Sequence, residues 1–436
     1  MKLALHGGEP VRSAPFPAYV TVGEEEKKAV CDVIDSGCLS KYLGAWHDQF
    51  NGGTQVRALE DEWAAYFGAK HAIVVNSCTS GLYCAVGATG VEPGEEIIVS
   101  PYTMSASATA PLIFNALPVF ADIEEDYFCL DPVDVERKIT SKTRAIIVVD
   151  IFGLPYDADK INALAKKHGL LVIEDTAQAP GATYKGGFAG TLADMGVFSL
   201  NYHKHIHSGE GGVIVTDDDD LAEKCRLIRN HAEAVVSAKG TTDLRNMIGF
   251  NFRMPEIEAA IARIQLQKLA GLNEKRFDNV SYFENQIAQL PFIQIPKVRE
   301  KATHAYYLHA CRFNKDVAGI DRNTYINAVR AELPHHELRE QEGVKLGVGY
   351  VKPLYLQPMF QQKIAYGSKG YPFVGANVDY SEGSCPVCER MYFDELFSHE
   401  FILPSMNERD IDDVVNAFVK VWDHKAELIS INESAG

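Results

Sequence analysis

One lysine lies among three histidines in the stretch SLNYHKHIHSGEGG, which runs from Ser199 to Gly212. Lys204 lies between His203 and His205, and His207 follows at the same alternating spacing. Alternate residues share one face of a strand, so three histidines could bind a metal if the preceding strand continued through them. A glycine-rich turn could instead bind a phosphate, and a lone lysine could form a Schiff base with a carbonyl group. The stretch by itself supports all three chemistries.

Polar groups also follow two apolar runs earlier in the chain. The run at residues 72–75 is followed by NSCTSG, which offers small hydroxyl residues at the predicted start of a helix. Free backbone N–H groups at a helix start attract an anion, although an ordinary helix cap has the same composition. The run at residues 170–174 is followed by Asp175. A carboxylate there needs a cationic or hydrogen-bonding partner, because an unpaired buried charge is costly.

These runs belong to a regular alternation of strand and helix patterns. Seven short runs rich in β-branched residues are predicted strands: residues 72–75, 97–100, 118–122, 145–149, 170–174, 196–200 and 213–216. They are nearly all apolar, which is typical of strands covered on both faces. Helical stretches such as residues 157–169 lie between the earlier strands. The pattern predicts an α/β domain with a largely parallel sheet.

The sequence beyond residue 254 predicts a second, smaller domain. A long helical pattern that begins at Met254 leaves the first domain, and an aromatic strand is expected at residues 304–313. A final helix is predicted from apolar residues at helical spacing: Ile411, Val414, Val415, Phe418 and Trp422. We therefore expect a large domain at residues 37–270, a small domain at residues 271–436, and an N-terminal segment, residues 1–36, that joins the small domain.

Length, charge and cysteine content limit the class of protein. A chain of 436 residues is too long for one compact core, and its net charge of −17 disfavours a nucleic-acid-binding protein. The sequence shows neither a signal peptide nor an apolar run that approaches a membrane span. Nine cysteines, an odd number, are typical of reduced cytosolic thiols. The close pair Cys385 and Cys388 lacks a second pair for zinc, so we expect both to be buried. A cytoplasmic protein without membrane insertion is predicted.

The three polar sites are the helix start in NSCTSG, Asp175 and Lys204. They form one ligand site if they meet at the carboxyl ends of neighbouring strands, where open α/β sheets bind ligands. Pyridoxal 5′-phosphate (PLP) requires a helix start for its phosphate, a carboxylate for its ring nitrogen and a lysine for its aldehyde. This favours Lys204 as a reactive amine. A metal site at the three histidines would find no nearby carboxylate except Glu210. We therefore predict that no metal binds there and that the histidines line the pocket or pack.

The chain resembles the sugar aminotransferase family of PLP enzymes, the StrS/DegT kind, over nearly its whole length. The motifs that carry the resemblance are VRALEDEWAAYFGAKHAIVVNSCTSGL, EEIIVSPYTMSASA, IEDTAQAPGATYKG, FSLNYHKHIHSGEGGVIVTDD and IGFNFRMPEIEAAI. Their order and spacing make the identification specific. The resemblance implies an aspartate-aminotransferase-like fold, in which a large domain has a mostly parallel seven-stranded sheet and the smaller C-terminal domain is also α/β.

The resemblance also implies roles for residues around the cofactor ring. Lys204 would be the catalytic residue, bonded to the cofactor as a Schiff base and moving the proton between cofactor and substrate carbons. Asp175 would pair with the ring nitrogen, and Gln178 would contact the ring near its hydroxyl. Met104 stands where the family usually has an aromatic residue stacked on the ring, and its thioether can lie on a π-face. Tyr102 is the alternative stacking residue.

A further set of residues would bind the cofactor phosphate. Cys78 and Thr79 lie where the family has its phosphate-binding loop, and Ser199 is a further ligand. Asn251 matches an asparagine that reaches the phosphate of the neighbouring subunit, which implies a homodimer with shared active sites. Without the surrounding motifs, Ser199 would be read as a buried strand residue and Asn251 as a turn residue.

The reaction implied by the resemblance is a ping-pong transfer of an amino group from glutamate to a keto- or aldehydo-sugar. Glutamine is the alternative donor. The acceptor is left open between a nucleotide-linked sugar, the 8-oxo-octulosonate precursor of 8-amino-Kdo in lipopolysaccharide, and an inosose ring. Two alternatives remain. A PLP-dependent sugar dehydratase shares the fold but has histidine at the position of Lys204, and a non-catalytic PLP-binding regulator could keep the same scaffold.

Overall fold

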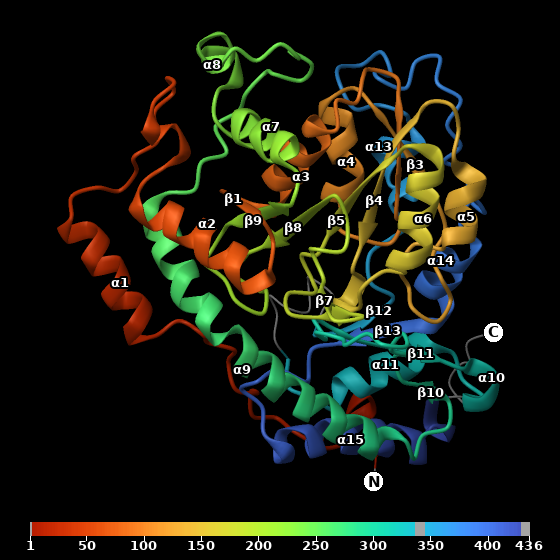
Figure 1. The fold of residues 1–436 in the computed structure, drawn as a ribbon. Helices are drawn as coiled ribbons and strands as arrows, with labels where there is room; N and C mark the ends of the chain where they lie inside the picture. Colours follow the sequence, from red (N-terminus) through yellow and green to blue (C-terminus); the bar gives the residue numbers. More distant parts are fainter. Residues whose placement is uncertain (1, 336–344, 429–436) are drawn as a thin grey trace.

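The computed structural model of the protein describes residues 2–335 and 345–428. A large α/β body and a smaller body lie side by side, joined by one long helix that crosses both (Figure 1). The large body contains a seven-stranded sheet in the order β1-β9-β8-β5-β4-β2-β3. Its strands are β1 (His71–Val75), β2 (Glu96–Val99), β3 (Leu117–Phe120), β4 (Thr143–Val149), β5 (Leu171–Asp175), β8 (Met195–Ser199) and β9 (Gly212–Thr216).

All seven predicted strands are therefore present, and the mostly parallel seven-stranded sheet is confirmed. Pairings from β8 through β5, β4 and β2 to β3 are parallel, and only β9 runs against its neighbours β8 and β1. A short hairpin, β6 (Thr183–Tyr184) with β7 (Gly187–Phe188), follows β5. Because the parallel strands share one direction, their carboxyl ends lie at one edge of the sheet.

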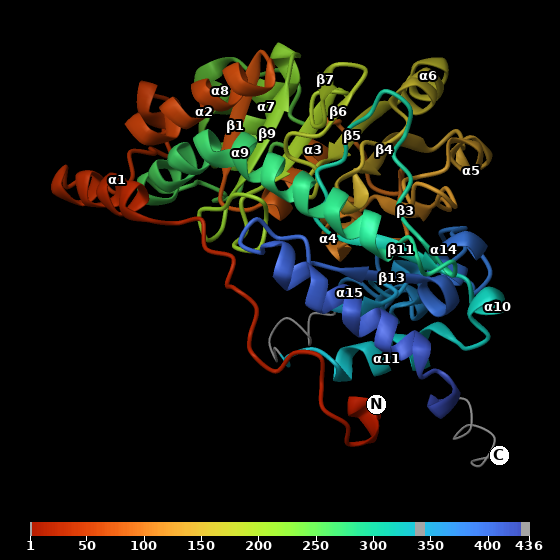
Figure 2. The same ribbon diagram turned by 90° about the horizontal axis from the view of Figure 1, so that it is seen from below.

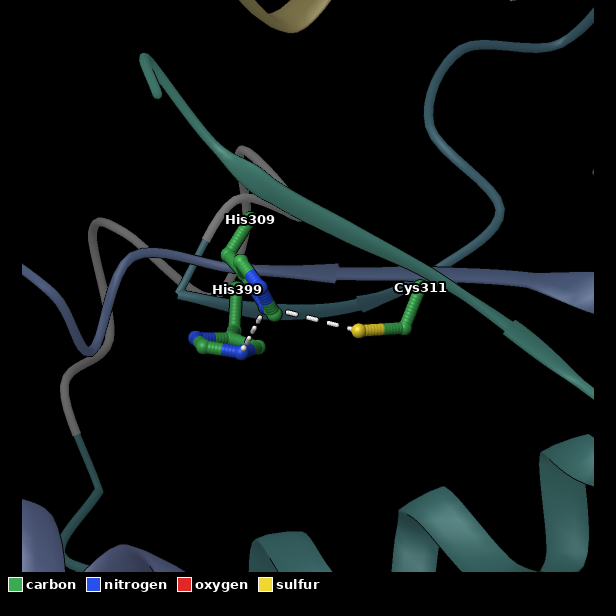
Figure 3. A group of neighbouring side chains, drawn as sticks. All are labelled: His309, Cys311 and His399. Atoms are coloured by element: carbon green, nitrogen blue, oxygen red, sulfur yellow. Dashed lines mark hydrogen bonds between the residues drawn. The ribbon is translucent and has the colours of Figure 1, made fainter. Parts of the chain in front are cut away.

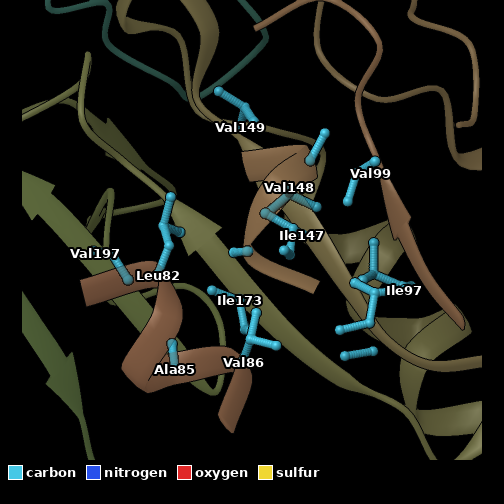
Figure 4. Close-up of a cluster of buried hydrophobic side chains, with 14 of the residues drawn as sticks. Leu82, Ala85, Val86, Ile97, Val99, Ile147, Val148, Val149, Ile173 and Val197 are labelled. Carbon is cyan, nitrogen blue, oxygen red and sulfur yellow. The ribbon is translucent and has the colours of Figure 1, made fainter. Parts of the chain in front are cut away.

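Helices cover both faces of this sheet: α2 (Thr54–Phe67), α3 (Cys78–Ala88), α4 (Ser105–Ile113), α5 (Pro132–Lys138), α6 (Ala158–His168) and α7 (Asp219–Arg229). The short helix α8 (Ala232–Lys239) lies against α7, away from the sheet. Leu82 and Val86 of α3 lie beside Ile173 and Val197 of the sheet (Figure 4). A Cβ added at Gly81 would lie 2.6 Å from Val197, so glycine lets the start of α3 approach β8 closely. The position of α3 over the strand ends follows from this contact.

The smaller body contains an antiparallel sheet in the order β10-β11-β13-β12. Its elements are β10 (Ile293–Gln294), β11 (His309–Phe313), α10 (Lys315–Ala318), α11 (Arg322–Ala331), β12 (Leu346–Val348), β13 (Leu396–His399) and α15 (Glu408–Asp423). Two short helices, α13 (Pro358–Gln361) and α14 (Pro386–Arg390), pack instead in the core of the large body through Phe360 and Cys388. The aromatic strand expected at residues 304–313 forms only from His309, and its first half is a loop. The predicted final helix is α15, and it buries Ile411 and Phe418 in the small core.

The helix α9 (Glu256–Ile287) belongs to both bodies, since Leu266 packs in a cluster with α2 and Phe283 packs in the small core. The N-terminal segment runs from the small body to α1 (Glu24–Asp35), which lies along α9 (Figure 2). Leu3 lies in the small core, whereas Lys268 of α9 pairs with Glu26 of α1 at 2.6 Å. The domain limits at residues 36 and 270 stay a prediction, because α9 passes through the second one without a break.

Two further predictions concern the cysteines and the membrane. Cys385 and Cys388 flank and enter α14 as free, buried thiols, and the N–H of Cys388 donates to Asp122, so both pack as expected. No helix of the described residues combines the length and the apolar character needed to cross a membrane.

Candidate active site

The start of α3 forms the first part of the candidate site. Ser77 caps this helix, and its Oγ accepts the N–H of Ser80 at 3.0 Å. The N–H groups of Cys78 and Thr79 begin the first turn, where a helix has no internal acceptors for them. The N–H of Asn76 donates to the carbonyl of Phe252, which ties the turn near Asn251 to the strand end. This helix start can receive an anion such as a phosphate.

Asp175 is the last residue of β5 and is buried. Its Oδ2 accepts a hydrogen bond from Ser107 Oγ at 2.7 Å, and its Oδ1 accepts the N–H of Ala177 at 3.2 Å. Burial raises the pKa of Asp175, while these two donors and the charge of Lys204 oppose the rise. Within the described parts of the chain no cation forms an ion pair with this carboxylate. A protonated ring nitrogen of a ligand would supply the missing partner.

The contact of Ser107 with Asp175 was not predicted from the sequence. It lies in the run PYTMSASATA after β2, where small hydroxyl residues are as frequent as at the start of α3. That composition was the one available signal, and nothing in it separated Ser107 from its neighbours.

Gln178 is held by contacts from both bodies of the protein. Its Oε1 accepts the N–H of Phe152 at 2.7 Å, and its Nε2 donates to the hydroxyl of Tyr350 at 3.1 Å. Tyr350 follows β12 of the small sheet, and burial raises the pKa of its hydroxyl. Gln178 therefore has one fixed orientation at the junction of the two bodies, which suits a side chain that must contact a planar ring.

Lys204 lies in the turn after β8 and is buried. Its Nζ lies 4.4 Å from the centre of the Tyr307 ring. Burial and the charge of Asp175 raise the pKa of the Cys78 thiol, and the charge of Lys204 lowers it. Lys204, Asp175 and Cys78 thus lie close enough to influence one another electrostatically. The structure brings the predicted lysine, carboxylate and helix start together. It also places the ring of Tyr307, which was not predicted, against the amine of Lys204.

The three histidines around Lys204 do not share a strand face, because β8 ends at Ser199. His205 is buried, and its Nε2 donates to the carbonyl of Ala305 at 2.8 Å. Burial keeps the pKa of His205 well below its usual range. His207 is half-buried and accepts the N–H of Gly209 at 3.3 Å. The alternation in the sequence therefore does not become a common metal-binding face.

Ser199 and Asn251 occupy different surroundings. Ser199 is buried at the end of β8, opposite Gly212 of β9. A Cβ on Gly212 would lie 2.7 Å from the backbone nitrogen of Cys78, so this strand pair lies directly against the start of α3. Asn251 is exposed, and its carboxamide oxygen accepts a hydrogen bond from Arg253 at 2.7 Å. Its expected role concerns a second subunit and stays a prediction.

Met104 and Tyr102 differ in their freedom to contact a ligand ring. Tyr102 is fully buried and meets the rings of Phe152 and Tyr350 edge-on. Met104 caps α4 with a side chain that is 62% exposed. Of the two, Met104 can turn toward a ligand without disturbing the core, which favours it as the stacking residue.

A cavity of about 470 Å³ lies next to Lys204. His203 and Tyr307 line it, and these two residues flank or contact the lysine. Tyr202, from the same turn as His203, also lines it. The rest of its wall comes from the N-terminal segment, α9 and the small body: Pro15, Phe16, Pro17, Ala18, Tyr19, Arg276, His335, Lys345, Glu400, Phe401, Leu403 and Met406. The cavity thus lies between the turn that contains Lys204 and the segments opposite that turn.

One group of possible metal ligands occurs among the described residues, in the core of the small body: His309, Cys311 and His399 (Figure 3). His399 Nδ1 accepts the N–H of Phe401 at 3.2 Å, so its Nε2 carries the proton and donates to His309 Nδ1 at 3.0 Å. His309 Nε2 then donates to Glu284 at 3.0 Å. The lone pairs that a metal would need are already used in this hydrogen-bonded chain.

Comparison with known proteins identifies the relatives of the chain. The sequence profile of the DegT/DnrJ/EryC1/StrS aminotransferase family matches residues 24–419. The chain is 32% identical over 402 residues to the spore coat polysaccharide biosynthesis protein SpsC of Bacillus subtilis, covering 91% of this chain and 94% of the relative. It is 31% identical over 440 residues to the L-glutamine:2-deoxy-scyllo-inosose aminotransferase of Streptomyces paromomycinus, covering 98% and 99%. A pleiotropic regulatory protein of Geobacillus stearothermophilus is 32% identical over 377 residues, covering 86% and 91%.

Solved structures have the same arrangement. The aminotransferase of Psychrobacter cryohalolentis superposes with a TM-score of 0.78 at 28% identity, covering 94% of this chain and 99% of that one. DesI, solved in the presence of its TDP-sugar product, gives a TM-score of 0.80 at 25% identity and covers 99% of both chains. A GDP-4-keto-6-deoxymannose-3-dehydratase gives 0.74 at 22% identity, covering 93% of this chain and 100% of that one, a likeness of fold alone.

Proposed function

The chain belongs to the DegT/DnrJ/EryC1/StrS aminotransferase family of PLP-dependent enzymes, and we propose that it transfers an amino group from glutamate to a carbonyl sugar. The observation that carries the proposal is the convergence of Lys204, Asp175 and the start of α3 at the carboxyl ends of β8, β5 and β1. A cavity of about 470 Å³ next to the lysine offers room for both substrates in turn.

The residues of this site fit the cofactor. Asp175 is a buried carboxylate with two hydrogen-bond donors and no ion pair within the described residues, which suits a protonated ring nitrogen. The first N–H groups of α3, at Cys78 and Thr79, with Ser199 beside them, suit a phosphate. PLP supplies, when bound, an electron sink for the bond that breaks at the amino donor's α carbon.

In this scheme, residues of the chain move the proton and orient the cofactor ring. Lys204 would take the proton from the α carbon of the donor and hold it for return, and the same amine would move a proton in the opposite direction when the sugar is aminated. Asp175 holds the ring nitrogen protonated, and Ser107 holds Asp175 in place. Gln178, fixed by Phe152 and Tyr350, orients the ring.

Glutamate is the proposed donor, and the acceptor is a sugar or cyclitol with a free carbonyl group. The names of two relatives support acceptors of both kinds, since one is an L-glutamine:2-deoxy-scyllo-inosose aminotransferase and the other was solved in the presence of its TDP-sugar product. The three acceptor classes are a nucleotide-linked keto-sugar, an 8-oxo-octulosonate of lipopolysaccharide and an inosose. An amination assay over this panel, run with glutamate and with glutamine, tests the proposal, and failure on every acceptor with both donors would count against it.

A non-catalytic PLP-binding regulator is the second candidate, because one relative carries the name of a regulatory protein. Such a protein would bind the cofactor through Lys204 and leave it unchanged when glutamate is added. The dehydratase alternative is less well supported, since that subgroup is expected to lack a lysine at this position and Lys204 is present and buried.

We also propose a homodimer whose partner contributes Asn251 to the phosphate site. Exposed apolar side chains near this turn support it, because Ile248 is 75% exposed and Leu244 is 61% exposed in the single chain.

All nine cysteines are free thiols, which supports a reducing compartment, the cytoplasm.

A further inference from the structure

Arg276 is a buried cation in the wall of the cavity beside Lys204. It lies on α9, and its side chain is 3% exposed. Its Nη1 donates to the carbonyl of Tyr306 at 3.1 Å, while its Nε is buried and reaches no acceptor among the described residues. No carboxylate of the described chain forms an ion pair with it, although Glu400 lines the same cavity. One donor, Nε, therefore lacks an acceptor, although the Tyr19 hydroxyl and the charge of Glu400 also act on the guanidinium.

A buried charge in this state is unfavourable unless a ligand compensates it. Removing a guanidinium from water costs several kcal/mol, and the cost is recovered only with an anion and well-aligned hydrogen bonds. Burial lowers the pKa of Arg276, but an arginine keeps its proton at every physiological pH. A guanidinium donates strong charge-assisted hydrogen bonds to a carboxylate, and Arg276 lines the cavity in which such an anion would lie.

The position of Arg276 relative to Lys204 is fixed by two short links. Tyr306, which accepts from Arg276, precedes Tyr307, whose ring lies 4.4 Å from Lys204 Nζ. The Tyr19 ring lies 5.6 Å from the guanidinium carbon, and the Tyr19 hydroxyl donates to the carbonyl of His205 at 2.6 Å. Arg276 and Tyr307 therefore line the same cavity, and the amine of Lys204 lies 4.4 Å from the centre of the Tyr307 ring.

We propose that Arg276 is a carboxylate-binding subsite of this cavity, which holds one end of a substrate while its reacting carbon lies at Lys204. The inference rests on the proposed function. The carboxylate can come from the amino acid donor or from an acidic sugar acceptor of the ulosonate type. Both present the same planar anion to the guanidinium, and only the donor must be bound in every catalytic cycle.

The test uses the PLP-loaded protein and the unreactive dicarboxylate glutarate, measured by calorimetry. The parent protein is expected to bind glutarate and not its diamide, glutaramide, which has the same length without charge. Arg276→Gln is expected to weaken glutarate binding about ten- to hundredfold, the loss of a charge-assisted pair of hydrogen bonds. Lys275→Gln, an exposed neighbour on α9, removes the same charge and should leave binding unchanged.

Kinetics then separate the two sources of the carboxylate. If the donor supplies it, Arg276→Gln raises the KM of glutamate and leaves the KM of a neutral inosose unchanged. If an acidic acceptor supplies it, the KM of the octulosonate rises and that of glutamate does not. Arg276→Lys, which keeps the charge and can keep the bond to Tyr306, covers the case in which the glutamine variant does not fold, and an intermediate loss is expected.

Glutarate binding that is equal in the parent, Arg276→Lys and Arg276→Gln, or glutaramide binding as tight as glutarate binding, would overturn the subsite. The proposed function fails in a different way. A protein that binds glutarate through Arg276 but aminates no sugar keeps the subsite and loses the aminotransferase proposal.

Discussion

Ser107, in the first turn of α4, donates a hydrogen bond of 2.7 Å from its Oγ to Oδ2 of Asp175 at the end of β5. The two residues are 68 positions apart and meet because β2 and β5 point the same way, with β4 between them. The bond fixes the carboxylate at the orientation in which its other oxygen accepts from Ala177. The carboxylate is thereby oriented before any ligand arrives, as its proposed role at a ring nitrogen requires.

Ser107→Ala is expected to weaken this arrangement. The carboxylate loses its shortest donor, its pKa rises further, and turnover should fall about five- to tenfold, which corresponds to one hydrogen bond of roughly 1 kcal/mol. PLP affinity measured by fluorescence should fall as well. Ser105→Ala, on the same helix but half-exposed, is the control. If the two variants had equal turnover, equal affinity and the same pH profile, the positioning role of Ser107 would be wrong.

Asp175→Asn keeps the shape of the side chain and removes its charge. The ring nitrogen then loses the anion that keeps it protonated, and the first half-reaction should slow by about a hundredfold or more, the scale of an electrostatic contribution to a transition state. Rapid mixing with glutamate measures the rate. Asp278→Asn, exposed on α9, should react at the parental rate. A parental rate in Asp175→Asn would contradict the assignment.

The carboxyl groups of Asp150 and Glu174 predict a pH dependence of stability. Both are fully buried, and they accept N–H groups from Tyr156 and Leu192, each at 3.0 Å. Their remaining oxygens, Asp150 Oδ2 and Glu174 Oε1, receive no N–H from the described chain, so a shared proton is needed between them. Burial raises the pKa of Asp150 to about 7 and that of Glu174 well above its usual range.

The native protein therefore holds a proton that the unfolded chain releases near the ordinary carboxyl pKa of about 4. A raised native pKa contributes stability that is full below pH 4 and lost as the pH rises toward 7, so the free energy of unfolding should decline between these values. Urea unfolding at a series of pH values measures this. Glu174→Gln carries its own N–H donor and should flatten the decline, whereas the exposed Glu274→Gln should not. The same slope in all three proteins would show that no proton is shared.

Mixed dimers test whether Asn251 acts across an interface. Subunits with Lys204→Ala and subunits with Asn251→Ala are each expected to be nearly inactive. In a heterodimer one site carries both defects and the other carries neither, so random mixing should restore about a quarter of parental activity if the site is shared. Mass spectrometry confirms that heterodimers form. Heterodimers without recovered activity would place Asn251 in its own subunit's site.

Much of the large domain follows from its sequence, because apolar strands and the polar residues after them are local signals. Lys204, Asp175 and Gln178 all follow predicted strands. Tyr307 does not, since it lies in the loop before β11, where a strand was expected, and β11 begins only at His309. The three histidines could have suggested a metal site only if a strand continued through them, and β8 ends before them. As predicted, His205 is buried and His203 lines the cavity.

Other parts of the site depend on contacts between distant segments. Tyr350 reaches Gln178 from the small body, and Tyr19 of the N-terminal segment lies over Arg276 of α9. Tyr350, Tyr19 and Arg276 have no neighbouring motif that marks them. Their roles come from the way α9 and the N-terminal segment bridge the two bodies, which periodicity in one stretch of sequence cannot specify.

The central claim is that Lys204 and its surroundings transfer an amino group, and one experiment tests it without knowledge of the sugar. The PLP-loaded protein is mixed with glutamate in the absence of any acceptor, and 2-oxoglutarate is counted per subunit. A ping-pong aminotransferase should release about one equivalent and then stop, and Lys204→Ala should release none. A cofactor-loaded parent protein that formed no oxo acid from glutamate or from glutamine would contradict the account and leave a binding protein in its place.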